Sequence, residues 1–226
     1  MLIKKEKTEL DARLVLLQTA ARLFAEHGFE AVSTRMLAKE AGVNMAMIGY
    51  YFGSKEKLFE AIIDEYIPKT REALLNILHQ NITSLEKFSM AMEVFVDKMF
   101  SNNAFSKLMY RELSLQQRPA HSERIMDAVM RNWQIMKEII AEGQQNRTFR
   151  KDIDTVMTLA SIFGTILQIV NTPIVAARAM QAEAQNDVFS DANRLRLKTH
   201  LKQMMQAHLL VREDDNDEEE EFQVSY

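Results

Sequence analysis

Residues 34–59 read TRMLAKEAGVNMAMIGYYFGSKEKLF, and the order of apolar and turn-forming residues in this stretch decides the fold of the N-terminal part of the chain. Residues 34–40 have the apolar spacing of a short helix, with Ser33 placed to cap its first turn. Gly42 suits the left-handed residue that ends a helix, and Asn44 suits the cap of the next one. The stretch therefore predicts two short helices joined by a tight turn, the build of a DNA-reading helix-turn-helix rather than of a catalytic site.

The second short helix is predicted from about residue 45 to residue 51. Its periodicity directs Ala46, Ile48 and Phe52 toward the interior. A glycine and a serine then close this helix and open the next, in which Lys55 lies in the first turn. A cation there opposes the helix dipole, so the position indicates a role such as binding phosphate. The candidates for the outer face of the short helix are Met45, Met47, Gly49, Tyr50 and Tyr51.

Three segments between residues 19 and 63 resemble the DNA-binding domain of the TetR family of transcriptional regulators. They are A-x-x-L-F-x-x-x-G-F, T-R-x-L-A-x-x-A-G-V and Y-Y-F-G-S-K-E-x-L-F. The match is dense and without gaps, and it covers about a fifth of the chain. The AGVN start of the recognition helix and the YYFGSKE ending more particularly resemble the CecR-like branch of the family.

The resemblance implies, position by position, how the domain contacts DNA. Thr34 and Arg35 match the start of the family's second helix, where a hydroxyl meets phosphate and an arginine reaches a base edge or the backbone. Lys55 matches a lysine that binds phosphate, whereas Gly49 departs from the family pattern. The implied DNA-binding positions are Thr34, Arg35, Asn44, Met45, Ala46, Met47, Tyr50, Tyr51 and Lys55.

The recognition helix offers few hydrogen-bonding side chains. Its base-facing start, residues 45–47, is apolar, so contact with thymine methyl groups is expected to contribute to readout, with Arg35 as the candidate for guanine. Contacts of Tyr50 and Tyr51 with the backbone fix register without reading sequence. Tyr51 also fits a core position, so its role stays open.

The charge of the chain is unevenly distributed. The formal net charge is −4, and no broad basic face indicates nucleic-acid binding. Residues 213–221, EDDNDEEEE, hold eight acids; without them 28 Lys and Arg face 24 Asp and Glu. Because like charges repel and bury nothing, residues 213–226 are predicted to form a disordered, solubilising tail. The alternative is an autoinhibitory tail that competes with DNA for basic residues such as Arg35 and Lys55.

Composition predicts an all-α fold. The chain has six glycines and three prolines among 226 residues, 47% hydrophobic residues and no alternating strand pattern. We expect a three-helix helix-turn-helix domain in residues 1–54 and a larger helical domain for ligand binding and dimerisation in residues 55–212. The helix after residue 55 connects the two. Helices are predicted at residues 9–27, 34–41, 45–51, 55–79, 84–101, 104–115, 121–145, 152–180 and 190–211.

Soft and aromatic side chains are concentrated in the second domain. They suit a pliable pocket for a small apolar or aromatic effector, although the same spacing describes ordinary helix core. The ligand-binding candidates are Met92, Phe95, Met99, Met109, Tyr110, Met130, Trp133 and Gln168. Arg111 and Glu112 are expected at the surface or in a local ion pair. Gln168 and Asn171 interrupt an apolar helix and need partners there.

The resembled family implies a homodimer, with the last two long helices of each subunit forming the interface. Pro173 is expected to kink the first of these helices. A two-fold dimer also suits DNA, because two equivalent subunits read two half-sites. The interface candidates are Ile166, Val170, Leu201, Met205 and His208.

The sequence gives no sign of an enzyme. It lacks phosphate-binding, metalloprotease and hydrolase motifs, contains no cysteine, and scatters its five histidines without metal-ligand spacing, so no catalytic residue, metal or cofactor is expected. No signal peptide or membrane-spanning segment is predicted, and a cytoplasmic location is expected. Two functions remain: a repressor released from a double-stranded DNA operator by a small ligand, and a DNA-bound interaction protein whose helical domain binds a protein partner.

Overall fold

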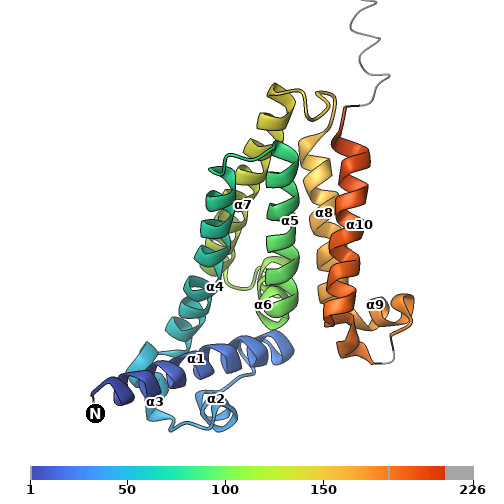
Figure 1. Ribbon diagram of the computed structural model, residues 1–226. Helices are drawn as coiled ribbons and strands as arrows, with labels where there is room; N and C mark the ends of the chain where they lie inside the picture. The colour runs from blue at the N-terminus through green and yellow to red at the C-terminus, as the bar shows by residue number, and fades with distance from the viewer. Residues whose placement is uncertain (1, 183, 212–226) are drawn as a thin grey trace, which may run out of the picture. The chain divides into compact units, whose positions relative to one another are not determined.

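The computed structural model describes residues 2–182 and 184–211, with the side chains of residues 2–11, 185 and 186 left out. Helices make up nearly all of this part of the chain (Figure 1), and its one β feature is an isolated bridge between Phe149 and Leu210. The predicted all-α fold class is therefore confirmed. The predicted acidic tail lies outside the described residues. The elements are α1 (Leu2–His27), α2 (Thr34–Ala41), α3 (Ala46–Phe52), α4 (Lys55–Leu78), α5 (Ser84–Ser101), α6 (Asn103–Leu115), α7 (Pro119–Gln145), α8 (Thr155–Asn171), α9 (Pro173–Met180), the 3-10 helix η1 (Gln185–Phe189) and α10 (Asp191–Leu209).

The predicted single helix over residues 152–180 is wrong. The structure has two helices there, α8 and α9, which meet at an angle of 96°. Thr172 lies between them, and both its backbone N–H and its Oγ1 donate to the carbonyl of Gln168, at 3.0 and 2.6 Å. Pro173 follows as the first residue of α9, a position where its missing N–H costs nothing. The capped end and the proline together produce a break rather than the expected kink.

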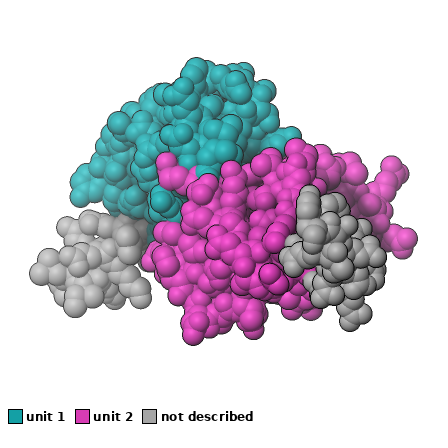
Figure 2. Space-filling view, turned by 90° about the horizontal axis from the view of Figure 1, so that it is seen from above, with its two compact units in different colours: residues 1–71, 101–130 teal, residues 72–100, 131–226 magenta. Residues whose placement is uncertain are grey.

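The chain folds into two compact units that interleave along the sequence (Figure 2). Unit 1 comprises residues 1–71 and 101–130, and unit 2 comprises residues 72–100 and 131–226. The predicted domains are consecutive stretches defined by function, so their boundary after residue 54 stays a prediction.

Unit 1 is built around three phenylalanines. The ring centroid of Phe29 lies 5.1 Å from that of Phe24 and 5.6 Å from that of Phe59, and the centroids of Phe24 and Phe59 lie 5.9 Å apart. Leu108 of α6 and Ile125 of α7 are fully buried in the same cluster. The helix-turn-helix therefore shares its core with two helices that come much later in the chain.

Unit 2 contains α5, α8, α9, α10 and the later part of α7. Its core includes Phe95 and Phe163, whose rings meet edge-on, and the half-buried Trp133 ring stacks on Phe163. Phe149 packs against Gly143 of α7 so closely that a Cβ at Gly143 would lie 2.0 Å from the ring. Only glycine permits this contact without displacing the ring.

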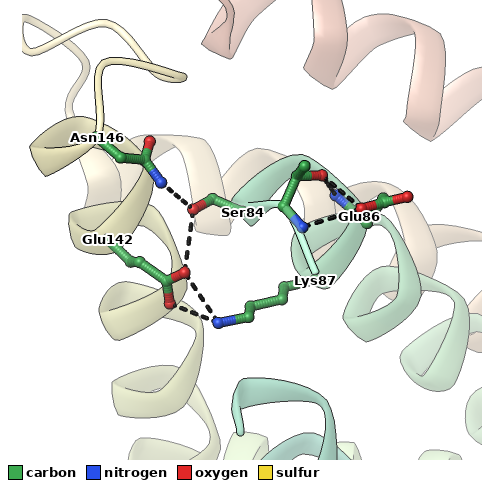
Figure 3. A network of polar contacts seen from close by, with 6 residues as sticks. Ser84, Glu86, Lys87, Glu142 and Asn146 are labelled. Carbon is green, nitrogen blue, oxygen red and sulfur yellow. Dashed lines mark hydrogen bonds and ion pairs between the residues drawn. The ribbon is translucent and has the colours of Figure 1, made fainter. Parts of the chain in front are cut away.

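A polar network braces unit 2 at the start of α5 (Figure 3). The buried Lys87 donates to both carboxylate oxygens of Glu142 at 2.8 and 2.9 Å, and Asn146 Nδ2 donates to Ser84 Oγ at 2.9 Å. Ser84 in turn donates to Glu142. The pairing satisfies a buried lysine and fixes α5 against the last turn of α7.

Within the described residues, no single helix has both the length and the apolarity to cross a membrane. Taken together, α8 and α9 are long and apolar enough to cross a membrane, but they are bent by 96° at Thr172.

Candidate nucleic-acid interface

Side-chain caps and glycine fix the two helices of the motif. Ser33 Oγ accepts the N–H of Met36 at 3.1 Å, which starts α2. Gly42 has φ 65°, in the left-handed region that favours glycine, and ends α2. Asn44 Oδ1 then accepts the N–H of Ala46 at 2.9 Å, so a side chain again satisfies a free donor at a helix start. The local geometry is the one that the sequence predicts.

The residue before α3 and several residues along this helix face solvent. Met45 is 55% exposed and Tyr50 is 75% exposed, while Ile48 is buried against the core of unit 1. Ala46 is exposed as well, so the prediction that it faces inward is wrong. Gly49 is open too, since a Cβ there would meet no atom within 4 Å. The exposed positions along α3 therefore combine the small residues Ala46 and Gly49 with the large ring of Tyr50.

The structure places all nine predicted DNA-binding residues on α2, on α3 with the turn before it, and at the start of α4, within unit 1. Arg35 and Asn44 are exposed together with Met45, Ala46 and Tyr50, while Thr34, Met47, Tyr51 and Lys55 are half-buried. Tyr50 and Tyr51 pack edge to face, with centroids 5.1 Å apart. The contacts of these residues with DNA stay predictions.

Lys55 has an intramolecular role that the sequence did not show. Its ammonium donates to the carbonyl oxygens of Phe29 and Val32 at 3.0 and 3.1 Å, and it lies 4.2 Å from the centroid of the Phe29 ring. The lysine thereby ties the start of α4 to the loop before α2. This role gives a second reason for a cation at a helix N-terminus, beside the phosphate contact.

The corner between α6 and α7 holds a charged cluster against the same loop. Glu112, 3% exposed, accepts from Arg118 through both carboxylate oxygens, with Nε to Oε2 at 3.1 Å. Of the two placements expected for Glu112, the surface or a local ion pair, the structure has the ion pair, and the carboxylate is buried. The guanidinium lies 4.1 Å from the centroid of the Phe29 ring and 5.1 Å from that of Phe59.

His121 completes this corner. Its ring stacks on Phe59 with centroids 4.9 Å apart, and its Nε2 lies 4.0 Å from Glu60 Oε1. Its Nδ1 is buried without a hydrogen-bond partner. Burial and the neighbouring Arg118 guanidinium lower the pKa of His121, against the opposing effect of Glu60 and Glu112.

The predicted ligand-binding residues are divided between the units. Unit 2 holds five: Met92 and Phe95 are in its core, Met99 and Trp133 are half-buried, and Gln168 is exposed and donates to Thr172 Oγ1 at 2.8 Å. Unit 1 holds the other three: Met109 is buried, whereas Tyr110 and Met130 are about half-exposed. Asn171 donates to the carbonyl of Leu167, so the partners of both amides are local.

Sequence reasoning missed Asn132. This side chain is 9% exposed, and its Oδ1 has no hydrogen-bond partner. It precedes Trp133 on α7, and a single amide within an amphipathic helix does not indicate from sequence that its oxygen is buried without a partner.

Four of the five predicted interface residues belong to the subunit's own core. Ile166, Val170, Leu201 and Met205 are at most 3% exposed, so a second subunit cannot reach them. His208 is exposed, and its Nε2 lies 3.1 Å from Thr158 Oγ1. A different face of α8 is open: it presents Met157, Ala160, Ser161, Gly164 and Gln168.

The part of the chain that the structure describes contains no cluster of three or more His, Cys, Asp or Glu residues that could hold a metal ion.

Two family models match the chain. The model described as bacterial regulatory proteins of the tetR family matches residues 16–62, which include the helix-turn-helix. The model described as the C-terminal region of YsiA-like proteins matches residues 59–190, more than half of the chain.

Curated relatives are similar at low identity. The probable HTH-type transcriptional regulator YttP of Bacillus subtilis (strain 168) is 26% identical over 137 residues, 59% of this chain and 65% of YttP. The fatty acid metabolism regulator protein of the same organism is 22% identical over 158 residues, 70% of this chain and 80% of that protein. The nucleoid occlusion factor SlmA of Mannheimia succiniciproducens is 26% identical over 178 residues, 75% of this chain and 81% of that protein. The chain thus spans just under two thirds of YttP and about four fifths of the other two.

Solved structures share the fold. The putative fatty acid metabolism regulator of Clostridium perfringens superposes with a TM-score of 0.70 at 17% identity, covering 88% of this chain and all of that one. The regulator FadR of Bacillus subtilis in complex with stearoyl-CoA superposes with a TM-score of 0.57 at 21% identity, covering 83% of this chain and 98% of that one. Identities this low show a common fold and nothing finer.

Proposed function

Because the chain belongs to the TetR family of bacterial transcriptional regulators, with a YsiA-like C-terminal region, we propose that it is a homodimeric repressor that leaves its operator when a small apolar ligand binds. The family consists of DNA-binding regulators and not of enzymes. A cytoplasmic location follows from this proposal, because the operator is there. Membership of the CecR-like branch is a further proposal that rests on the AGVN and YYFGSKE segments alone.

The exposed start of α3 carries the DNA-binding part of the proposal. Met45 and Tyr50 are the large apolar or aromatic side chains that this helix holds out to solvent, on a backbone fixed by the Asn44 cap. An exposed methionine at a capped helix N-terminus suits thymine methyl groups in the major groove. Arg35 and Lys55 are the proposed phosphate or base contacts beside it.

The open face of α8 supports the homodimer. α8 contains no charged residue, and its exposed side chains recur at a spacing of three or four, from Met157 to Gln168. The hydroxyls of Ser161 and Thr165 donate to carbonyls of the preceding turn, so these donors need no hydrogen bond to water. An uncharged helix face with small residues suits close contact with a second copy of the chain.

The proposed ligand belongs to the helical region after residue 54. Fatty acid regulators and a regulator in complex with stearoyl-CoA are among the similar proteins. The aromatic and methionine side chains of the unit 2 core offer an apolar surface of the kind that an acyl chain would contact. We therefore propose a ligand with a long apolar chain, with a fatty acyl-CoA as its candidate form.

Selection of bound duplexes from a random pool, followed by affinity measurements with added ligand, tests this function. Wild-type protein is expected to enrich one two-fold symmetric sequence, and stearoyl-CoA is expected to weaken binding to it. Tyr50→Ala and Arg35→Ala are expected to lower the affinity by about 1–3 kcal/mol each if they contact DNA. Failure to enrich any sequence would refute the DNA contacts, and an unchanged affinity with acyl-CoA would refute the ligand class.

Nucleoid occlusion factors are also among the similar proteins, and their match covers as much of the chain as that of the fatty acid regulator. Because one fold serves regulators with different roles, the alternative proposal is a DNA-bound protein whose helical part binds a protein partner and no small molecule. Ligand-independent operator binding would favour this alternative.

A further inference from the structure

The loop between α1 and α2 fixes the two helices on either side of the recognition helix α3, namely α2 and α4. It contains Phe29 and Val32, whose carbonyls bind Lys55, and it ends at Ser33, whose side chain caps α2. A contact that holds this loop in place therefore also holds the starts of α2 and α4. The Phe29 ring is its largest buried group, with 5% exposure.

Two cations lie close to the Phe29 ring. The Lys55 ammonium is 4.2 Å and the Arg118 guanidinium 4.1 Å from its centroid. Two like charges around one buried ring repel each other unless a negative group compensates. Glu112 supplies that charge through its paired contact with Arg118, and Glu30 Oε1 lies 3.5 Å from Arg118 Nη1.

Glu112 is itself rigidly placed. Its backbone carbonyl accepts from the Gln116 N–H at 3.0 Å, where α6 ends in a left-handed residue, and from Ser122 Oγ at 3.2 Å. The carboxylate therefore belongs to the α6–α7 corner, whereas the ring that Arg118 covers belongs to the loop. Arg118 thus links the corner to the loop that fixes α2 and α4, beside the stack of His121 on Phe59.

We propose that Arg118, held by Glu112, is a positioning residue for DNA recognition: it fixes the Phe29 loop and transmits displacements of the α6–α7 corner to the starts of α2 and α4. The guanidinium touches no DNA. Its effect is on the orientation of the helices that do. The regulatory part of this inference rests on the proposed ligand response, whereas its effect on operator affinity does not.

Arg118→Met combined with Glu112→Leu tests the inference in the full-length protein. Removing both charges leaves no unpaired buried ion, so we expect a folded variant whose melting temperature stays within about 5 °C of wild type. The matched control is Arg124→Met combined with Asp64→Leu, which removes an exposed ion pair between α7 and α4. The affinities of each protein for the selected operator and for a scrambled duplex are compared at one salt concentration.

The expected result is a loss of about tenfold in the ratio of operator to scrambled affinity for the Arg118 and Glu112 variant, with scrambled binding unchanged, and no change for the control. A folded variant with the wild-type ratio would overturn the proposal. If the double variant does not fold, Arg118→Lys decides: it keeps the charge but loses the planar, bidentate group, and an unaltered ratio in it would overturn the proposal equally.

The regulatory part has its own measurement. If stearoyl-CoA weakens operator binding of wild type, the Arg118 and Glu112 variant is expected to respond at least about threefold less. An equal response in both proteins would show that the signal bypasses Arg118. If wild type does not respond to stearoyl-CoA, the proposed ligand fails, while the ligand-free affinity ratio still decides the positioning role.

Discussion

Two helical glycines differ in the space around them. Gly143 gives Phe149 its place, because a Cβ there would lie 2.0 Å from the ring, whereas Gly49 has open space around it. We predict that Gly143→Ala lowers the free energy of unfolding by about 1–3 kcal/mol through overpacking. Gly49→Ala, the control, is expected to raise it by about 0.5–1 kcal/mol, because alanine favours a helix interior. Urea unfolding without DNA measures both, and equal signs for the two variants would contradict the packing argument.

His121 makes stability depend on pH. Its folded-state pKa is lowered from the usual 6.5 by burial and by Arg118, with a smaller lowering by Arg124 and opposing effects of Glu60 and Glu112. As the pH falls below 6.5, the unfolded chain takes up a proton that the folded chain resists, so stability is lost down to the folded pKa and then levels off. Above 6.5 the residue contributes no pH dependence.

We therefore predict that His121→Phe, which keeps a ring against Phe59, reduces the fall in melting temperature between about pH 7.5 and pH 5.5. Thermal unfolding across this range is the measurement. His79→Gln, an exposed histidine on the other unit, is the control. A curve for His121→Phe that runs parallel to wild type would show that other groups cause the pH dependence.

At the scale of an element, α8 depends on its first turn. Asp154 Oδ1 accepts the N–H of Met157 at 3.0 Å, and the helix has no acidic residue in its first turn to help. Asp154→Ala is predicted to lower the free energy of unfolding by about 1 kcal/mol, whereas Asp154→Asn, which retains the accepting oxygen, is expected to cost little. Chemical denaturation of the two variants side by side distinguishes a lost cap from a lost charge.

The elements also show what sequence alone can predict. Ser33, Gly42 and Asn44 act on their immediate neighbours, so their positions predict the helix-turn-helix correctly. The break between α8 and α9 needed more, because the hydrogen bonds of Thr172 turn a proline kink into two helices. Local chemistry is visible in a sequence, but the angle between two helices is set by packing as well.

Contacts between residues far apart in the sequence could not be predicted, for a different reason. The periodic apolar residues of α8 and α10 mark the most buried face, and periodicity cannot tell a subunit's own core from an interface. Ile166 and Leu201 were chosen by that pattern and proved to be core. For Glu112 the sequence left the surface and a local ion pair open, because Arg118, the partner that permits its burial, lies beyond the end of its helix.

For the whole molecule, the exposed apolar residues replace those buried ones as the predicted interface. Met157 on α8 is 60% exposed and Leu195 on α10 is 65% exposed. We predict that Met157→Glu or Leu195→Glu converts a dimer into folded monomers, because a charge would be buried unpaired at the interface. Light scattering and thermal unfolding together measure this outcome.

Ile166→Glu is the comparison. This residue is fully buried within the subunit, so the same charge is expected to unfold the protein rather than dissociate it. If Ile166→Glu instead yields folded monomers while the two surface variants stay dimeric, the assignment of core and interface is reversed.

The interleaved path of unit 1 limits how the protein can be recombined. Residues 1–71 enclose Phe24 and Phe59 only together with Leu108 and Ile125, which lie 37 and 54 residues after residue 71. A chimaera that grafts the first 71 residues onto the sensor of another regulator would need that sensor to supply matching apolar side chains, as well as a partner for the Phe29 loop. DNA specificity is therefore easier to exchange between such regulators by altering the exposed residues of α3 in place than by transplanting residues 1–71.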